Sequence, residues 1–374
     1  MSQRINWAKV LATIPDCPDT LSMMPAPDSL DLRQRAAQML LVGFRGCHAR
    51  DCAPVLDDIV RIGVGGVILF DRDVADPSLP LRNVASPVQL RELVTALKSA
   101  ARIPLLVAID QEGGQVNRLK ESRGFPASVS HAVLGAAPGE EGTRAAADAI
   151  ARTLAEAGIN FNLAPVVDLD ANPDNPIIRG RERCFSADPD AVVRHARAYI
   201  EAHRARGVLC CIKHFPGHGS AAGDTHAGLV DVTATWSERE LLPFQRLIAS
   251  DACHAVMSAH VFNAALDPVH PATLSHAVLT GVLRERLGFG GLILTDDMQM
   301  GAIAARYGLQ EAVERAVCAG ADLLCFGNNL HFDPAIAEKV TGILVRGVEE
   351  GRVPLARIEA SSARVLAFKA RLSF

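Results

Sequence analysis

The 374-residue sequence lacks most of the features that mark specialised classes of protein. Its formal net charge of -4 gives it no excess of positive charge that would attract nucleic acid or an anionic membrane surface. No apolar run approaches the roughly 18 residues that a membrane-spanning helix needs. Residues 1–20 contain no apolar core of signal-peptide length. These absences predict a soluble, cytoplasmic protein that binds neither nucleic acid nor membranes.

The cysteines show no pattern of the kind that disulfide-stabilised or zinc-binding proteins have. There are 9 of them, an odd number, with no Cys-x-x-Cys pair and no regular spacing. Cys210 and Cys211 are adjacent within an apolar run, which predicts buried thiols. The distribution therefore indicates reduced cysteines in a reducing compartment.

What the sequence does contain is a regular alternation of apolar runs and amphipathic helical patterns. Most of the apolar runs are continuous, as is typical of strands buried on both faces. There are eight, at residues 38–44, 63–70, 103–110, 159–169, 207–215, 254–262, 290–297 and 321–327. Helical patterns lie between them at 88–103, 143–158, 190–207, 237–251, 274–290 and 309–320. Eight such units predict an α/β fold, a single (β/α)8 TIM barrel.

The same pattern predicts how the chain is divided. Residues 29–374 form the barrel, and residues 1–28, rich in Pro, Asp and Met, form a short N-terminal extension. The alternative fold is a doubly wound open sheet, which would show a Gly-rich phosphate turn after its first strand; residues 44–51, FRGCHARD, are not such a turn. Within the helical pattern at 237–251, Ser237 and Glu240 predict a capping box.

Polar residues end several of the predicted strands. In a barrel of this kind the active site lies at the C-terminal ends of the strands. A charged group at the end of a buried strand is costly unless it is satisfied or used. The candidates are Asp110, Asp168, Lys213, His214, His260, Asp296 and Asp297. Because neighbours on a strand face opposite ways, only one of Asp296 and Asp297 points along the barrel axis, and the other is expected to cap the following turn.

The stretch KHFPGHGSAAGDTH at residues 213–226 has three interpretations. A metal site would use its three histidines and Asp224, but Lys213 opposes a cation and the Pro–Gly pair forbids a regular helix. A proton-transfer site would use Asp224 and His226, since a nearby carboxylate fixes the tautomer of an imidazole and raises its basicity. In the third interpretation the stretch is a polar loop, with His218 in a structural role.

Three long motifs occur in order on the third, fifth and seventh predicted strands: DQEGGQVNR (110–118), KHFPGHG followed by DTH (213–226), and LILTDDMQM (292–300). Together they resemble glycoside hydrolase family 3, in its bacterial β-N-acetylglucosaminidase branch. The resemblance runs from about residue 30 to the C-terminus. It implies a (β/α)8 barrel and a retaining double displacement, with Asp296 as the nucleophile. It also implies that His226 is the general acid/base, assisted by Asp224.

The resemblance further implies which residues bind the sugar. The corresponding positions are Asp110, Arg118, Lys213 and His214. One more family arginine falls in IIRGRERCF (177–185), where Arg183 matches best and Arg179 and Arg181 remain alternatives. Asp168 and His260 have no matching role, so we expect them to be structural or to lie behind the site.

The function expected from the resemblance is that of an exo-acting β-N-acetylglucosaminidase, a monomer or weak oligomer that needs no metal or cofactor. It would release the non-reducing terminal N-acetylglucosamine from a small carbohydrate, such as a muropeptide fragment in cell-wall recycling. A phosphorylase is an alternative, because a histidine acid/base does not repel an incoming phosphate. Further alternatives are a β-glucosidase, a metal-dependent hydrolase and a non-catalytic sugar-binding barrel.

Overall fold

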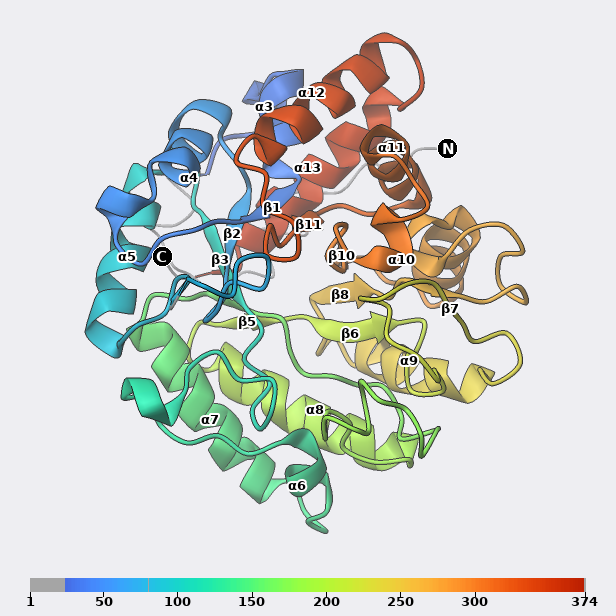
Figure 1. Cartoon of the computed structure of the whole chain (residues 1–374). Coiled ribbons are helices and arrows are strands. Elements are labelled where there is room, and N and C mark those ends of the chain that lie inside the picture. The colour runs from blue at the N-terminus through green and yellow to red at the C-terminus, as the bar shows by residue number, and fades with distance from the viewer. Residues whose placement is uncertain (1–23, 80, 373–374) are drawn as a thin grey trace.

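The computed structural model describes residues 24–79 and 81–372, in which strands and helices alternate around one central axis (Figure 1). The strands of the barrel are β1 (Leu40–Gly43), β2 (Gly66–Leu69), β3 (Leu106–Ile109), β4 (Phe161–Asn162), β5 (Leu209–Cys210), β6 (Ile212–Phe215), β8 (Ala255–Ser258), β10 (Leu292–Thr295) and β11 (Leu324–Phe326). Each of the eight predicted apolar runs contains at least one of these strands.

All neighbouring strands of the barrel run parallel. One sheet has the order β11-β1-β2-β3-β4-β5 and a second has the order β10-β8-β6. Parallel bridges between Val166 and Lys213 and between Leu294 and Leu323 join the two sheets at both edges, so the ring closes. The prediction of a (β/α)8 barrel is confirmed, and the alternative of an open sheet is wrong.

Helices surround the sheet on its outer face (Figure 1). They are α3 (Leu32–Gln38), α4 (Ala53–Asp57), α5 (Pro87–Ala100), α6 (His131–Gly135), α7 (Glu141–Glu156), α8 (Pro189–Arg204), α9 (Leu242–Ala249), α10 (Gly301–Ala304), α11 (Leu309–Ala319), α12 (Ile336–Glu349) and α13 (Leu355–Lys369), with a π-helical segment at Ala277–Arg286. Several begin at a side-chain cap. Ser86, for example, forms a capping box with Gln89 at the start of α5.

The strands are continuously apolar because both of their faces are buried. Along β3, Leu106 and Ala108 belong to the cluster inside the barrel, whereas Val107 and Ile109 pack outward against the helices. This alternation follows from the two-residue period of a strand. Phe368, near the end of α13, packs against Phe161 inside the barrel, with ring centroids 4.9 Å apart. The interior is therefore filled, and polar groups find room at the strand ends.

The predicted capping box at Ser237 is wrong. The Ser237 side chain makes no cap, and the chain enters α9 through a short helical turn at Glu238–Leu241. Glu240 is buried and accepts hydrogen bonds from Gly219 N at 2.9 Å and Ser220 N at 3.3 Å. Buried N–H groups need an acceptor, and this requirement outweighs the local capping pattern.

Most of the predicted N-terminal extension, residues 1–23, lies outside the described residues. Its last residues include a short helical turn at Pro27–Ser29, directly before α3. The boundary at residue 28 therefore stays a prediction. Across the part of the chain that the structure describes, no helix has both the length and the apolarity that crossing a bilayer requires.

Candidate active site

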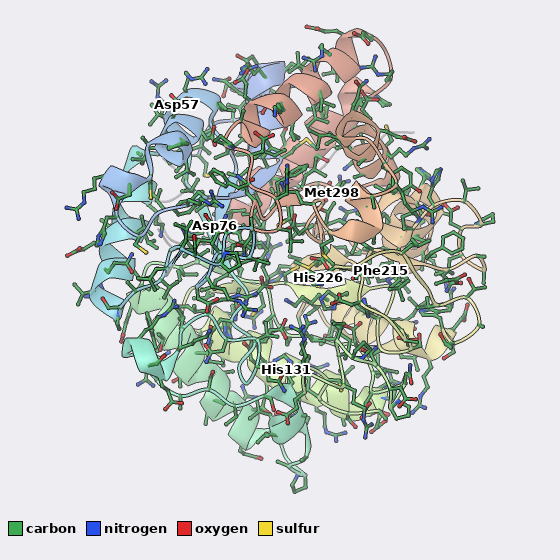
Figure 2. All side chains as sticks on the ribbon, in the orientation of Figure 1. Asp57, Asp76, His131, Phe215, His226 and Met298 are labelled. Carbon is green, nitrogen blue, oxygen red and sulfur yellow. The ribbon has the colours of Figure 1, made fainter. Side chains whose placement is uncertain are left out.

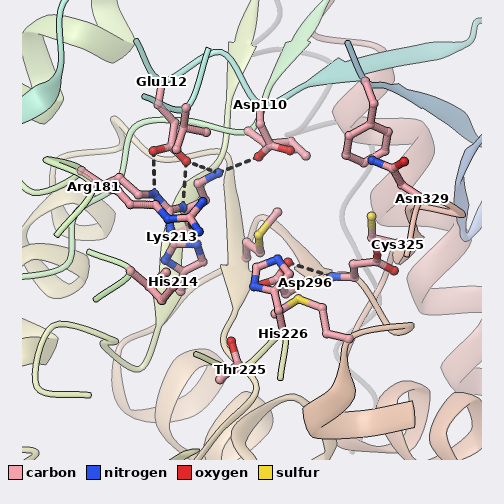
Figure 3. A pocket seen from close by; sticks show the side chains of 18 of the residues that line it. Asp110, Glu112, Arg181, Lys213, His214, Thr225, His226, Asp296, Cys325 and Asn329 are labelled. Atoms are coloured by element: carbon pink, nitrogen blue, oxygen red, sulfur yellow. Dashed lines mark hydrogen bonds and ion pairs between the residues drawn. The ribbon is translucent and has the colours of Figure 1, made fainter. Parts of the chain in front are cut away.

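A cavity of about 380 Å³ opens at the C-terminal ends of the barrel strands (Figure 3). All eight residues predicted to act in catalysis or sugar binding line it: Asp110, Arg118, Arg183, Lys213, His214, Asp224, His226 and Asp296. In the view down the barrel in Figure 2, His226 and Phe215 lie near the centre, whereas Asp57 and His131 lie out among the helices. The topology thus brings together side chains that are up to 186 positions apart in the sequence, from Asp110 to Asp296.

One side of the cavity is a charged cluster made by Asp110, Glu112, Arg183 and Lys213. Lys213 Nζ lies 2.7 Å from Asp110 Oδ1 and 2.7 Å from Glu112 Oε1 (Figure 3). Arg183 donates two hydrogen bonds of 2.8 Å to Glu112. Burial alone would raise the pKa of Glu112, but Arg183 and Lys213 hold it well below its usual range. Burial alone would lower the pKa of Lys213, yet Asp110 and Glu112 raise it. Glu112 and Lys213 therefore stay charged at neutral pH.

Glu112 is the residue that the sequence reasoning missed. It follows Asp110 by two positions, in a tight turn where Glu112 N and Gly113 N both donate to Val116 O. Gly113 and Gly114 have φ angles of 103° and 59° there, which favour glycine. The available signal was a third charged residue inside the motif DQEGGQVNR. Its position beside Arg183, however, depends on the fold.

The structure distinguishes the three candidate arginines. Arg183 is in the charged cluster and also contacts His214 Nε2 at 3.2 Å. Arg181 lines the cavity at its rim and is exposed. Arg179 does not line the cavity and instead pairs with Asp170 at 2.6 Å near the surface. Of the three arginines, Arg183 is therefore the one that belongs to the charged cluster, and its role in binding a sugar stays a prediction.

Asp296 follows directly after β10 and faces the cavity. One of its oxygens accepts a hydrogen bond of 2.8 Å from Asp297 N. Burial would raise its pKa, but the imidazoles of His260, His214 and His226 outweigh that effect and lower the pKa to about 2. Asp296 is thus a carboxylate at any physiological pH, as a nucleophile must be.

Asp297 differs from its neighbour in both contacts and protonation. Its Oδ1 accepts hydrogen bonds from Gln299 N and Gly327 N, each at 3.0 Å. Burial raises its pKa to about 6, against the effect of these hydrogen bonds. Asp297 therefore caps the turn after β10, as was expected of one member of the pair.

The three histidines of the stretch 213–226 do not converge on a common point. Each has its own partner: His214 Nδ1 lies 2.7 Å from Asp168 Oδ2, His218 Nε2 lies 3.5 Å from Thr225 Oγ1, and His226 Nδ1 lies 2.8 Å from Asp224 Oδ1. Over residues 24–79 and 81–372, no three His, Cys, Asp or Glu side chains are grouped so that they could hold a metal ion. The donor arrangement thus does not match the metal-site interpretation.

Asp224 and His226 form a dyad on a loop beside the cavity. One carboxylate oxygen of Asp224 accepts from both His226 N and His226 Nδ1, at 2.8 Å each. Burial would raise the pKa of Asp224, but these hydrogen bonds lower it. Because Asp224 holds Nδ1, the Nε2 nitrogen of His226 is the one that can face a substrate. The side chain of His226 is 52% exposed, so the dyad is the accessible part of the site.

Asp168 and His260 lie behind the site. Asp168 accepts hydrogen bonds from His214 Nδ1, His214 N and His218 N, and so fixes the chain around the end of β6. His260 contacts Asp297 O at 2.9 Å through its Nε2. Both residues therefore position groups that line the cavity.

Comparisons with known proteins point to one family. The family model "Glycosyl hydrolase family 3 N terminal domain" matches residues 31–368. The β-hexosaminidase A of Pseudoalteromonas piscicida is 32% identical over 343 residues, which cover 85% of this chain and 55% of that protein. The β-hexosaminidase of Alkalilimnicola ehrlichii is 38% identical over 282 residues, which cover 73% of this chain and 76% of that protein.

Solved structures give the same result. A glycoside hydrolase family 3 β-N-acetylglucosaminidase from Paenibacillus sp. FPU-7 superposes with a TM-score of 0.83 at 36% identity, over 91% of this chain and 62% of that one. A β-N-acetylhexosaminidase from Beutenbergia cavernae superposes with a TM-score of 0.80 at 31% identity, over 91% of this chain and 98% of that one. The chain therefore spans about half the length of some relatives and nearly the full length of others.

Proposed function

The chain belongs to glycoside hydrolase family 3, and from this premise we propose that it is a retaining, exo-acting β-N-acetylglucosaminidase. The observation that carries the proposal is that the ionised Asp296 and the Asp224–His226 dyad line the same cavity. The names of the relatives, β-hexosaminidases and β-N-acetylglucosaminidases, support the choice of sugar.

In the first step, the Asp296 carboxylate attacks the anomeric carbon while His226 donates its proton to the leaving oxygen. In the second step, neutral His226 takes a proton from water, and the water displaces Asp296 from the sugar. Most retaining glycosidases use a second carboxylate for this task. An imidazole changes charge near neutral pH without needing a buried, strongly perturbed environment. Asp224 orients the ring and stabilises its protonated form.

The charged cluster holds the sugar during both steps. Asp110 accepts hydrogen bonds from sugar hydroxyls, and Lys213, Arg183 and Arg118 donate to them. Since the donors and acceptors are already fixed by their own ion pairs, they need little rearrangement when the sugar binds.

We propose that the natural aglycone is anionic, as in muropeptide fragments of cytoplasmic cell-wall recycling. Two exposed arginines, Arg72 and Arg181, line the cavity rim. Neither forms an ion pair or hydrogen bond with another part of the described chain, although the charge of Arg181 contributes to the lowered pKa of Asp224. Arg118 and Arg183 in the same cavity are both paired. A guanidinium that no carboxylate of the protein contacts directly suits a carboxylate on the bound fragment.

Two substitutions test the chemistry. Asp296→Ala should abolish turnover of every substrate. His226→Ala should lower kcat/KM for N,N'-diacetylchitobiose by about 10²–10⁴-fold, but should affect a 4-nitrophenyl glycoside much less, because a nitrophenolate leaves without protonation. The exposed His276 lies outside the cavity, and His276→Ala is the matched control.

Equal losses on both substrates in His226→Ala would contradict the acid/base assignment. Product analysis with and without inorganic phosphate separates hydrolysis from phosphorolysis, since a phosphorylase forms a sugar 1-phosphate. Formation of this product would replace the hydrolase proposal with a phosphorylase on the same site.

A further inference from the structure

Gly301, the first residue of α10, lies against the backbone of the loop that carries the dyad. A Cβ atom at this position would lie 2.7 Å from His226 O and 3.0 Å from Ala227 C. Contacts this short with backbone atoms require the chain to move. The φ angle of Gly301 is not positive, so its conformation alone does not require glycine. The close approach of the loop is therefore the physical reason for glycine here.

Two hydrogen bonds join the loop to the same place. Gly301 N donates to His226 O and Ala302 N donates to Thr225 O, each at 3.1 Å. The first N–H groups of a helix have no acceptor within the helix. Here their acceptors are the carbonyls of two consecutive loop residues, one of which is His226 itself.

The segment that receives the loop also carries Asp296. Only five positions separate Asp296 from Gly301. The segment between them is fixed, since Met298 N donates to Cys325 O at 2.9 Å and Met300 N donates to Asp297 O at 3.0 Å. The contact at Gly301 therefore sets the position of His226 relative to Asp296.

One side-chain contact also holds the loop at Thr225, whose Oγ1 lies 3.5 Å from His218 Nε2. The other anchors of the loop lie further from the dyad. Asn175 Nδ2 donates to His218 O and Gly219 O, and Glu240 accepts from Gly219 N. At the far end, β7 (Val230–Asp231) pairs with β9 (Val261–Phe262). Within the described chain, residues 222–229 make two backbone hydrogen bonds to residues outside their own loop, and both of these bonds go to α10.

We propose that Gly301 is a positioning residue, which allows the loop to dock on α10 and so places His226 at a working distance from Asp296. The inference rests on the proposed roles of these two residues. A side chain at position 301 moves the proton donor and leaves the nucleophile and the charged cluster in place.

The test is Gly301→Ala, assayed with an unactivated and an activated substrate. We expect kcat/KM for N,N'-diacetylchitobiose to fall by at least about ten-fold, because small displacements of a catalytic group have large effects on rate. For the 4-nitrophenyl glycoside, kcat/KM should stay within about three-fold of the unchanged protein, since its first step needs no acid.

Azide gives a second readout. It attacks the anomeric carbon of the glycosyl-enzyme, the bond from that carbon to Asp296 breaks, and a glycosyl azide leaves without any proton being removed. Azide should therefore raise kcat of Gly301→Ala on the 4-nitrophenyl glycoside, and should do so to a much smaller extent in the unchanged protein. A purely structural defect would not produce this rescue.

The matched control is Gly308→Ala, because a Cβ at Gly308 meets no atom within 4 Å. It should behave like the unchanged protein. Ala302→Pro is a second test variant, which removes the N–H that donates to Thr225 O and places a methylene group there. Ala302 lies in the first turn of α10, where the N–H groups have no acceptor within the helix. It should show the same dependence on the leaving group, and it carries the test if Gly301→Ala does not fold.

Either of two results would overturn the proposal: no loss on any substrate, or equal losses on both substrates without azide rescue. His226→Ala separates the two proposals. If His226→Ala depends on the leaving group and Gly301→Ala does not, the role of Gly301 is wrong and the acid/base assignment stands. If His226→Ala itself shows no such dependence, the proposed function fails first.

Discussion

The two sides of the cavity are built in opposite ways. The charged cluster of Asp110, Glu112, Arg183 and Lys213 is largely buried, and every charge in it has an opposite charge at 2.7–2.8 Å. The dyad sits on a loop, with Asp224 32% and His226 52% exposed. One side is fixed by ion pairs and by the barrel, and the other is held by a few backbone contacts.

This difference matches two different tasks. A group that binds hydroxyls works best when it is already oriented, because reorganising it would cost free energy at each turnover. A proton carrier has to serve first a leaving oxygen and then a water molecule, so some freedom is useful. We infer that the protein places binding on the strand ends and proton transfer on the loop for this reason.

The largest effect is expected when a charge is removed from the charged cluster, the fixed side of the cavity. Glu112→Gln leaves Arg183 without its bidentate partner and Lys213 with one carboxylate in place of two. Removing one member of a buried ion pair typically costs about 3–5 kcal/mol. We expect a loss of this size in the free energy of unfolding, measured with urea. We also expect a large fall in kcat/KM that is the same for activated and unactivated substrates.

The control for this variant is Asp170→Asn, which removes the partner of the half-exposed Arg179. Exposed ion pairs contribute little, so stability and activity should stay near those of the unchanged protein. If Glu112→Gln were as harmless as this control, the charged cluster would not be the fixed side of the site.

The sequence reveals the strand-end groups because a barrel obeys simple rules. Continuous apolar runs mark strands buried on both faces, and a polar residue at the end of such a run faces the mouth. Asp110, Lys213 and Asp296 could be found in this way. The dyad could be found from the spacing of Asp224 and His226, but the assignment of the acid/base role came from the family resemblance.

Contacts between distant segments could not be found in this way. Glu112 is important because Arg183, 71 positions later, folds against it. Gly301 contacts His226, 75 positions earlier, and nothing in its local sequence indicates this. At Glu240 the local pattern was misleading, since buried N–H groups of a remote loop took the carboxylate that a capping box would use.

A smaller effect, on folding stability, is expected at Glu240, which accepts hydrogen bonds from the start of the loop that carries the dyad. Burial raises its pKa to about 7, although hydrogen bonds from Ser220 and Gly219 oppose the shift. In the unfolded chain a glutamate ionises near pH ~4.3, whereas in the folded protein Glu240 keeps its proton up to about pH 7. Folding stability is therefore lost as pH rises through this window.

Glu240→Gln should remove that loss, because the amide oxygen can still accept from Gly219 N and has no charge to bury. The difference in unfolding free energy between the variant and the unchanged protein should be about 1–3 kcal/mol larger, in favour of the variant, at pH 8 than at pH 5. Urea unfolding at both pH values measures the gain. An equal difference at the two pH values would show that Glu240 does not titrate in this range.

The smallest effect is expected at the open end of the cavity, where neither ion pairs nor loop docking hold the side chains. Replacing both Arg72 and Arg181 with Gln should lower kcat/KM for a disaccharide with a carboxylate on its aglycone by about three- to ten-fold, because exposed charge pairs are weak. Neutral N,N'-diacetylchitobiose should be affected much less, since for this substrate only the contribution of Arg181 to the lowered pKa of Asp224 is lost. Added salt should reduce the difference between the two substrates. Arg179→Gln, an exposed arginine outside the cavity, is the control. A similar loss on both disaccharides would mean that the rim arginines support the loop and do not select the aglycone. The rim arginines would then belong to the same side of the cavity as the dyad, opposite the charged cluster.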